Sequence, residues 1–266
     1  MNLTSDAFAR LPRRTAHTPS VRLAAETHVG CVRNENQDYF HVDHEGAFMI
    51  VADGMGGHAG GKVASRIATA AAARVLEQHR GLARDEVRHV MRLAFEAANK
   101  ALAHEAARRP KLAHMGTTLL CVARTADDEL AIAHVGDSRL YRLRDGALAQ
   151  LTRDHTMLNE LLQQGMITPD KAIQNRHLSH VLTRSIGVSG RFWPDIALIQ
   201  LQPGDRFLLA SDGLYGALSP VAMGLAMGNS PSLTHCCDLL IRAAIRANAS
   251  DNVTAVLVEI IDLHDA

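Results

Sequence analysis

The chain has 266 residues, 47% of them hydrophobic, so it is long enough to bury a core as one large domain or two small ones. Its 28 basic residues equal its 28 acidic residues, and this balance gives no support to binding of nucleic acid or an anionic membrane surface. No apolar run reaches the roughly 18 residues of a membrane-spanning helix.

The N-terminal region and the cysteines bear on the cellular compartment of the protein. Residues 1–20 contain arginines but lack the apolar segment of a secretory signal, so we expect a flexible N-terminal tail. The four cysteines include no CxxC pair. A disulfide framework would be unusual at this chain length, and the adjacent Cys236 and Cys237 cannot easily bridge each other, so a reducing compartment is favoured. We therefore expect a soluble, cytoplasmic protein.

Short segments rich in Val, Ile, Leu and Phe, bounded by Gly, Asp or Asn, are typical of β-strands. They cover residues 21–29, 38–43, 46–52, 117–124, 128–136, 138–144, 192–201, 205–210 and 252–261. Residues 128–136 and 138–144 are close enough in sequence to form a hairpin.

Apolar stripes at helical spacing predict two long helices between the early and the middle strands. The stripes are Ala64, Ile67, Ala68, Ala71, Val75 and Leu76, and then Val87, Val90, Met91, Ala94, Phe95, Ala98 and Leu102. A third helix, over about 232–247, places Cys236 in its stripe as core filling rather than as a reactive thiol.

Residues 154–181 interrupt the strand pattern and predict an inserted surface element. They are helical near Asn159–Gln163, and Thr168-Pro169 has the form of a helix cap followed by proline at the first helical position. Elsewhere strands come in runs and helices in pairs. This order favours antiparallel sheets covered by helices over an alternating βαβ fold.

Aspartates stand at strand ends. Asp53 and Asp212 each follow an apolar strand and precede glycine, Asp137 follows the strand 130–135, and Asp251 comes just before Val253–Val258. A single Asp-Gly pair indicates only a turn. If these ends converge, however, the carboxylates repel one another, and either protons or divalent cations must relieve the repulsion.

The kinds of side chain favour one group of metals. Oxygen ligands without a matching Cys/His set favour Mg²⁺ or Mn²⁺ over zinc. Gly54 lacks a Cβ, which could allow its backbone carbonyl to turn toward an ion. Two ions roughly 3.5–4 Å apart can polarise a shared water and clamp a phosphoryl group for in-line attack.

Seven segments in chain order carry a family resemblance. They are Arg33-Asn34-Glu35-Asn36-Gln37-Asp38, Val51-Ala52-Asp53-Gly54-Met55-Gly56-Gly57-His58, Met115-Gly116-Thr117-Thr118-Leu119, Val135-Gly136-Asp137-Ser138-Arg139, Leu182-Thr183-Arg184-Ser185-Ile186-Gly187, Ala210-Ser211-Asp212-Gly213-Leu214 and Asp251-Asn252-Val253-Thr254. Together they closely resemble the bacterial branch of the metal-dependent type 2C (PPM) protein phosphatases, over about residues 22–260.

The resemblance implies an α+β fold, a four-layer α-β-β-α sandwich of two antiparallel sheets flanked by helices, in a phosphatase domain over residues 21–262. It also implies a metal site with two core ions and a third, weaker one. The implied metal-binding residues are Asp53 as the bridge between the core ions, the Gly54 carbonyl on one of them, Asp212 and Asp251 on the other, Asp38 in the outer shell of metal-bound waters, and Asp137 with Asp212 at the third ion.

The implied activity is direct hydrolysis of phosphoserine and phosphothreonine in proteins. A hydroxide bridging two Mn²⁺ or Mg²⁺ ions would attack phosphorus without a phosphoenzyme, so Asp53 and Asp212 would be catalytic. Arg33 would hold the substrate phosphate with its planar set of donors. Residues 154–181 would be the family's mobile flap. The expected partners are phosphorylated proteins and an opposing bacterial Ser/Thr kinase, and a monomer is expected.

Structural roles stay open for several of these residues. Arg33 could form an ordinary ion pair, and Asp38 and Asp137 could serve only their turns. Met55 stands where eukaryotic relatives carry a histidine often assigned as the general acid, and His58 is interpreted as structural, which leaves the general acid open.

The remaining histidines and the activity itself also have more than one interpretation. The pairs His41/His44 and His177/His180 have a spacing that is common by chance.

A catalytically silent phosphoprotein-binding module of the same fold is the rival function, although silent relatives typically lose a ligand aspartate and none is lost here. We see no sensor, coiled coil or anchor beside the domain, so we expect control by a partner, the flap or metal supply.

Overall fold

The computed structural model describes residues 3–4, 21–56, 60–188 and 192–263. The strands are β1 (Leu3–Thr4), β2 (Val21–His28), β3 (Asp38–Val42), β4 (Phe48–Met55), β5 (Gly116–Thr117), β6 (Leu119–Arg124), β7 (Glu129–Val135), β8 (Arg139–Arg144), β9 (Ala147–Gln150), β10 (Asp195–Gln200), β11 (Arg206–Ala210) and β12 (Val253–Ile260). The helices are α1 (Gly60–Gln78), α2 (Val87–Arg108), α3 (Met157–Gln163), α4 (Pro169–Ala172), α5 (Asp212–Ala217), α6 (Pro220–Asn229) and α7 (Leu233–Arg246), with 3₁₀ turns η1 (Pro110–Leu112) and η2 (Arg176–His180).

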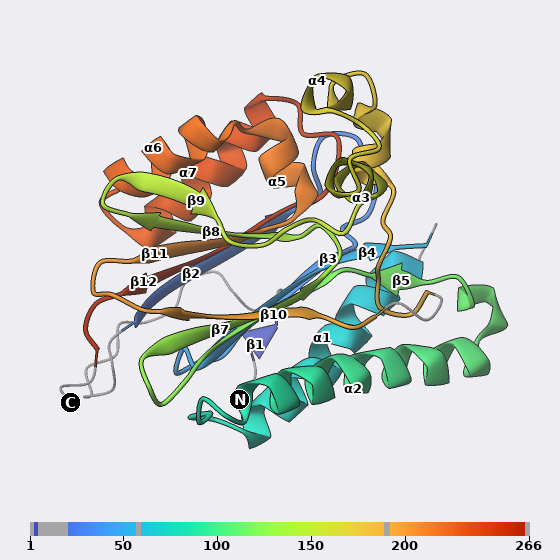
Figure 1. Cartoon of the computed structure of the whole chain (residues 1–266), viewed down its shortest axis with the longest axis horizontal. Helices are drawn as coiled ribbons and strands as arrows, with labels where there is room; N and C mark the ends of the chain where they lie inside the picture. Colours follow the sequence, from blue (N-terminus) through green and yellow to red (C-terminus); the bar gives the residue numbers. More distant parts are fainter. Residues whose placement is uncertain (1–2, 5–20, 57–59, 189–191, 264–266) are drawn as a thin grey trace.

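Two antiparallel sheets lie face to face between two layers of helices (Figure 1). The larger sheet has the order β1-β3-β4-β6-β7-β10, with β5 also paired to β4, and the smaller has the order β2-β12-β11-β8-β9. Helices α1 and α2 pack on the outer face of the larger sheet, and α5, α6 and α7 cover the smaller one. The expected four-layer α-β-β-α sandwich is confirmed.

Side-chain alternation along the strands divides the core into three parts. On β4, Phe48, Ile50 and Ala52 face the helices, whereas Met49 and Val51 face the other sheet. Successive side chains of a strand point to opposite faces, so Asp53 continues the inner row at the strand's end. The same alternation applies to β3, β11 and β12, and it sets where their polar terminal residues point.

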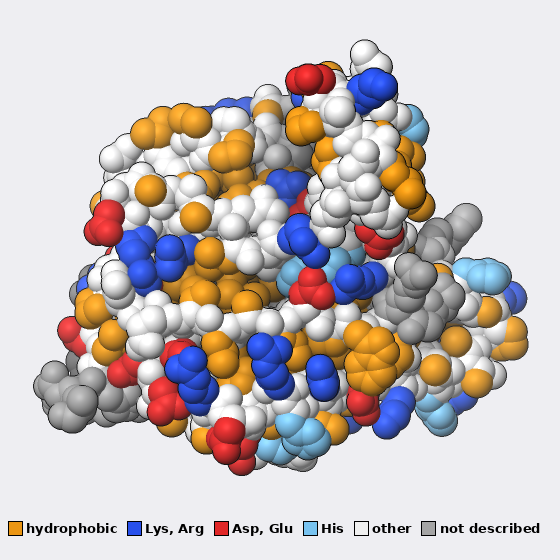
Figure 2. All heavy atoms as spheres, in the orientation of Figure 1, with side chains coloured by type: hydrophobic (Ala, Val, Ile, Leu, Met, Phe, Trp, Pro, Cys, Tyr) orange, Lys and Arg blue, Asp and Glu red, His pale blue; other side chains and the backbone are white. Residues whose placement is uncertain are grey.

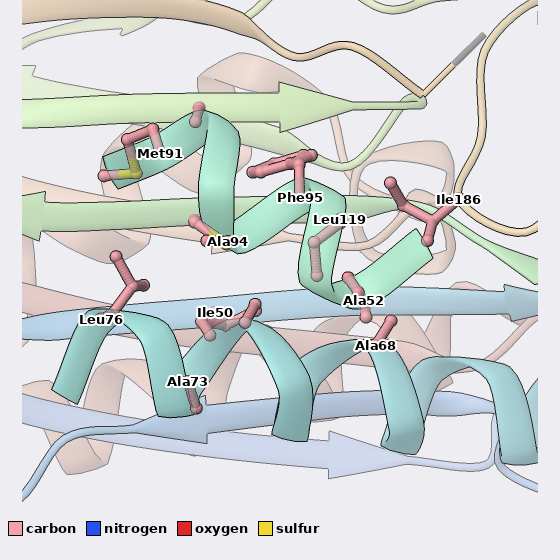
Figure 3. Packing of buried hydrophobic residues seen from close by; sticks show 14 of the residues in the cluster. Ile50, Ala52, Ala68, Ala73, Leu76, Met91, Ala94, Phe95, Leu119 and Ile186 are labelled. Atoms are coloured by element: carbon pink, nitrogen blue, oxygen red, sulfur yellow. The ribbon is translucent and has the colours of Figure 1, made fainter. Parts of the chain in front are cut away.

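The predicted stripe of α2 is fully buried, and that of α1 is buried in part, since Ile67, Ala71 and Val75 are half-buried. Every residue predicted for the α2 stripe is buried, and Figure 3 shows Met91, Ala94 and Phe95 packed among the residues of α1 and the larger sheet. On α1 the buried stripe includes Ala72 and Ala73 rather than the predicted Ala71. In α7, Cys236 is fully buried, and burial raises the pKa of its thiol, as expected of core filling.

All nine predicted strands are present within a few residues of their expected bounds, but the predicted hairpin is wrong. Strand β7 belongs to the larger sheet and β8 to the smaller one, so residues 136–138 cross between the sheets. Gly136 has φ +100°, a conformation that favours glycine, and a Cβ there would lie 2.6 Å from the Thr118 side chain. Strand β8 pairs instead with β11 and with β9, a strand that the sequence pattern did not predict.

Residues 154–181 form the predicted inserted element, which contains α3, α4 and η2 and projects from the sandwich at one end (Figure 1). Thr168 precedes Pro169 at the start of α4, as the sequence predicts. Helices α5 and α6 were not predicted. Of the expected tail, only Leu3 and Thr4 are described, paired with β3, so that prediction stays untested.

The distribution of surface charge agrees with the composition. Acidic and basic side chains are interspersed on the face shown in Figure 2, in keeping with the chain's equal numbers of each. Within the described ranges, none of the helices is long and apolar enough to cross a membrane.

Candidate active site

A cleft of about 1010 Å³ opens at one end of the sandwich, where β4, β7 and β11 end and β3, β8 and β12 begin. It is lined by Val32, Arg33, Asn34, Glu35, Gln37, Asp53, Gly54, Met55, Gly56, His114, Thr118, Asp137, His180, Leu182, Thr183, Ser185, Val188, Asp212, Asp251 and Asn252. Six of the seven residues predicted for the site are therefore in one cleft. The seventh, Asp38, is buried next to Asp53.

Asp38 and Asp53 come together because β3 and β4 are paired in register, with Asp38 directly opposite Asp53. Both continue the inner-facing rows of their strands, so both point between the sheets. The Oδ2 atom of Asp38 accepts hydrogen bonds from Ser211 Oγ and Thr254 Oγ1, each at 2.6 Å. These hydroxyls come from the other sheet, so Asp38 joins the two sheets beneath the cleft.

Asp53 has a firmly held backbone. Its N–H donates to Thr118 Oγ1 at 2.8 Å, and its carbonyl accepts from the backbone N–H of Thr118 at 2.9 Å and from Thr117 Oγ1 at 2.8 Å. The next residue, Gly54, lies so close to the start of α1 that a Cβ would be 2.0 Å from the Gly61 carbonyl oxygen. Strand β4 therefore needs glycine here for packing as well as for any use of its carbonyl.

Asp212 and Asp251 are brought together by a similar close contact. Asp212 is the first residue of α5, and a Cβ on the following Gly213 would lie 2.1 Å from the Asn252 carbonyl oxygen. Asn252 also accepts from the Gln37 N–H at 2.8 Å and donates to the carbonyls of Val29 and Glu35. Asn252 thus fixes the loop that carries Arg33 against the strand that follows Asp251.

Arg33 lies at the rim of the cleft, where its side chain is 57% exposed. Its Nη2 donates to Asp251 Oδ2 at 2.7 Å. The ion pair that was the alternative role for Arg33 is therefore present. Most of the guanidinium's donors nevertheless remain open to a second anion in the cleft.

Asp137 reaches the cleft because residues 136–138 cross between the sheets. It is only 6% exposed. Burial, then the charges of Asp212 and Asp154, raise its pKa to about 7. A hairpin between β7 and β8 would have placed Asp137 on a turn of one sheet instead.

Mutual repulsion marks the other carboxyl groups as well. Burial raises the pKa of Asp38 to about 8, against the opposing effect of its two hydroxyl hydrogen bonds. Burial, then the charges of Asp38 and Asp212, raise the pKa of Asp53 well above its ordinary value. Burial and the charge of Asp251 raise the pKa of Asp212, while Asp53 and Arg33 oppose the shift. Without a cation, the pKa of each of these carboxyl groups lies above that of an ordinary aspartate.

The donor set fits hard divalent cations. Asp38 Oδ1 and Asp212 Oδ1 are buried without a hydrogen-bond partner, which is costly unless an ion or a water satisfies them. Within the described part of the chain, only His134, His155 and Asp195 offer three ligand atoms all within 4.8 Å of one another, so the cleft aspartates are spaced more widely. That spacing suits Mg²⁺-like ions, which take one or two carboxylates and keep several waters.

The remaining histidine predictions have mixed outcomes. His58 lies outside the described residues. His41 stacks on Phe48, at 5.3 Å between ring centroids. His180 lines the cleft, with Nδ1 4.0 Å from Asp212 Oδ2, although the sequence analysis interpreted its spacing from His177 as chance and did not place it at the site. The bonding roles of Ser211, Thr254 and Asn252 were also missed, although all three stand inside the quoted motifs.

A helix-covered antiparallel sandwich with clustered aspartates and an arginine at one end points to the class of metal-dependent hydrolases of phosphate esters. The chain belongs to the protein phosphatase 2C family, whose model matches residues 32–257. The family that the motifs resemble is therefore confirmed.

Among curated relatives, the serine/threonine protein phosphatase PstP of Mycobacterium tuberculosis is 35% identical over 242 residues, which cover 91% of this chain and 45% of PstP. The chain thus spans just under half the length of that relative. Protein phosphatase PhpP of Streptococcus pneumoniae is 35% identical over 235 residues, 87% of this chain and 94% of PhpP. A crystal structure of the PstP catalytic domain with two manganese ions matches with a TM-score of 0.79 at 35% identity, over 91% of this chain and 99% of that one.

Proposed function

We propose that this protein hydrolyses phosphoserine and phosphothreonine in other proteins with divalent cations, Mn²⁺ or Mg²⁺, held in the aspartate cleft. The observation that carries the proposal is the convergence of Asp53, Asp137, Asp212 and Asp251 on one cleft, with Asp38 beneath them and Arg33 at the rim. The manganese ions in the PstP structure support the choice of metal.

The roles of the carboxylates follow from their positions. Asp53 lies opposite Asp38 and shares the cleft with Asp137, Asp212 and Asp251, which suits a side chain shared by two ions. Gly54 would add its carbonyl, and Asp212 and Asp251 would hold the second ion. Asp38, buried and already bonded to two hydroxyls, suits an outer-shell role of orienting bound waters through its open Oδ1. Asp137 with Asp212 would hold a third, weaker ion.

When bound, the core ions would activate a water for attack on phosphorus and neutralise the charge of the phosphate. Arg33 would bind the phosphate oxygens with the donors that it does not use for Asp251, and so orient the ester. The nucleophile would then be water, with no phosphoenzyme. The residues of the cleft hold this geometry in place before substrate arrives, because their backbones are fixed by the Thr118 and Asn252 contacts.

The substrates would be phosphorylated proteins, since the cleft is open at the end of the sandwich and Arg33 stands at its rim. An opposing Ser/Thr kinase completes the proposal. Residues 154–181 would act as a flap, because His180 brings this element to the wall of the cleft.

A metal-dependence assay on the whole chain tests the proposal. The protein is stripped with a chelator and assayed on p-nitrophenyl phosphate and on a phosphothreonine peptide, with and without Mn²⁺. We expect hydrolysis of both substrates that requires the metal and stops on chelation. Binding of the phosphopeptide without hydrolysis under any divalent metal would instead identify a silent binding module.

A further inference from the structure

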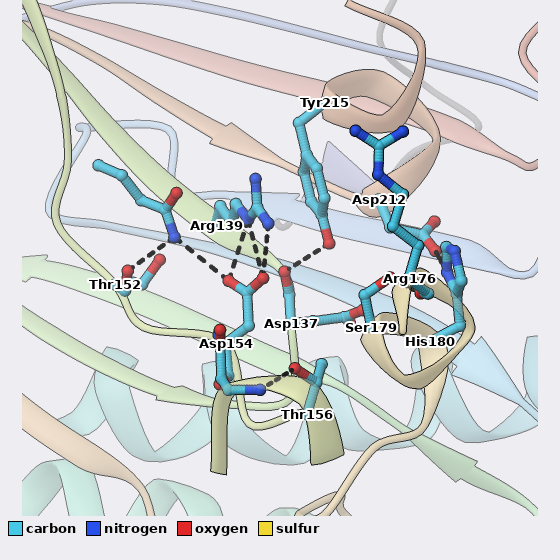
Figure 4. A network of polar contacts seen from close by, with 12 residues as sticks. Asp137, Arg139, Thr152, Asp154, Thr156, Arg176, Ser179, His180, Asp212 and Tyr215 are labelled. Carbon is cyan, nitrogen blue, oxygen red and sulfur yellow. Dashed lines mark hydrogen bonds and ion pairs between the residues drawn. The ribbon is translucent and has the colours of Figure 1, made fainter. Parts of the chain in front are cut away.

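The first residues of the inserted element hold residues 136–138, which cross between the sheets and carry Asp137, and also Arg139, which begins β8. The His155 N–H donates to the Gly136 carbonyl at 3.0 Å, and the Gly136 N–H donates to His155 Nδ1 at 3.2 Å. The neighbouring residue, Asp154, accepts from Arg139, Nε to Oδ1 at 2.9 Å and Nη2 to Oδ2 at 2.6 Å (Figure 4). Both ends of this crossing segment are therefore fixed by adjacent residues at the base of the flap.

The group His134, His155 and Asp195 has the spacing of a metal site, but its protons argue against one. Because the Gly136 N–H points at His155 Nδ1, that nitrogen carries the lone pair and the ring proton is on Nε2. Nε2 lies 3.2 Å from Asp195 Oδ2 without a hydrogen bond of good geometry, and because it carries the ring proton it has no lone pair to offer a metal. His155 thus connects the crossing segment to β10.

Arg139 extends the contact toward α5. Its guanidinium carbon lies 3.7 Å from the centroid of the Tyr215 ring, a cation–π contact, while the pair with Asp154 holds the guanidinium in place. The side chains of Arg139 and Asp154 are 25% and 8% exposed, so little solvent screens the pair. Arginine suits this position because it can bind a carboxylate with two donors and stack on a ring at once.

Tyr215 connects this network to the backbone of Asp137, one of the residues assigned to metal binding. Its hydroxyl donates to the Asp137 carbonyl at 3.0 Å (Figure 4). Tyr215 stands on α5, three residues after Asp212, and therefore joins the helix that begins at Asp212 to the segment that carries Asp137.

We propose that Tyr215, held by Arg139 and through it by Asp154, is a positioning residue that sets the separation of Asp137 and Asp212. These two carboxylates are the pair assigned to the third ion, so the inference rests on the proposed function. The network makes the affinity of that third site depend on the base of the flap. The core carboxylates Asp53 and Asp251 are anchored by other contacts and do not depend on it.

The test uses the whole chain, stripped of metal and titrated with Mn²⁺, with bound ions counted by electron paramagnetic resonance of free manganese and by calorimetry. In Tyr215→Phe we expect the dissociation constant of the weakest site to rise about five- to tenfold, the effect of losing one buried hydrogen bond. The two tighter sites should stay within about twofold. Arg139→Lys, which keeps the charge but loses the paired donors, should weaken the third site at least as much.

The matched control is Tyr141→Phe. Tyr141 accepts a hydrogen bond from Arg139 Nη1 at 3.1 Å but does not contact Asp137. Because the hydrogen bonds from Arg139 to Asp154 remain in this variant, we expect all three affinities to be unchanged. Unchanged third-site affinity in Tyr215→Phe would overturn the inference. So would an equal weakening of all sites together with a lower melting temperature, or a wild-type chain that binds only two ions. A wild-type chain that binds no manganese would instead overturn the proposed function.

Discussion

Asp38 and Asp53 lie directly opposite each other on the paired strands β3 and β4, both on the face that looks into the sandwich. Like charges in this relationship destabilise a sheet, so their pairing is not explained by folding stability. Both pKa values are raised, Asp38 to about 8, which shows how strongly the metal-free site opposes full ionisation. A site of this kind is stabilised by whatever cation replaces the protons.

The stability of the metal-free protein should therefore fall as pH rises. Asp38 has a folded pKa of about 8 against an ordinary value of 3.8, so its protonated form stabilises the fold most fully below about pH 4, and this contribution is lost as pH rises through about 8. We expect melting temperatures in chelator to fall between about pH 4 and 8, and saturating Mn²⁺ to abolish the fall. Asp38→Asn should flatten the profile in chelator, and an unchanged pH dependence in that variant would contradict the assignment.

Replacing Asp212 by asparagine should reduce turnover by at least about 100-fold, because the cleft loses a charge that balances the cations. Phosphopeptide hydrolysis at saturating Mn²⁺ measures the effect. Asp238→Asn is the matched control, since Asp238 pairs with Arg242 on the surface of α7. Turnover in Asp212→Asn equal to that of the control would place the metal site elsewhere.

Replacing Arg33 by alanine should raise KM for phosphopeptides about tenfold or more, with a smaller fall in kcat, because donors to the phosphate are lost. The variant also removes the partner of Asp251, so Mn²⁺ affinity is measured beside the kinetics. Arg84→Ala removes a similarly exposed arginine, paired with Glu129 and outside the cleft, and should leave KM unchanged. A fall in kcat at constant KM would exclude phosphate binding as the role of Arg33.

Two glycines of α5 should respond in opposite ways to alanine. Gly213→Ala puts a Cβ 2.1 Å from the Asn252 carbonyl, so we expect a loss of about 1–3 kcal/mol in the free energy of unfolding and weaker metal binding. Gly216→Ala, in the same helix, meets nothing within 4 Å and should be neutral or stabilising by up to about 1 kcal/mol. Denaturant unfolding measures both, and equal effects would mean that the contact of α5 with Asn252 is not tight.

Local patterns were sufficient for much of the fold. The nine strands, the two long helices and α7 follow from side-chain periodicity, because burial on one face leaves a repeat of two or 3.6 residues in the chain. Helices α5 and α6 escaped prediction. The first has only 6 residues, and the second is apolar around most of its surface, so neither shows an amphipathic stripe.

The site was predicted as a set of residues but not as a geometry. The motifs named Asp38, Asp53, Asp212 and Asp251, and alternation along their strands already directs the first two into the space between the sheets. The contacts of Tyr215, Asp154 and His155 with residues 136–139 left no signal in the sequence. They join parts of the chain that are far apart, and no local repeat records such a contact.

The sequence by itself determined most helices and strands, the family and the carboxylates of the site, because each of these can be inferred from local residue spacing and from the order of the motifs. Only the tertiary structure decided that β7 and β8 lie in different sheets. Their short connection is as compatible with a hairpin as with a crossing. Gly136 packs on Thr118, His155 accepts a hydrogen bond from Gly136, and Arg139 pairs with Asp154. These contacts stabilise the crossing, which in turn positions Asp137.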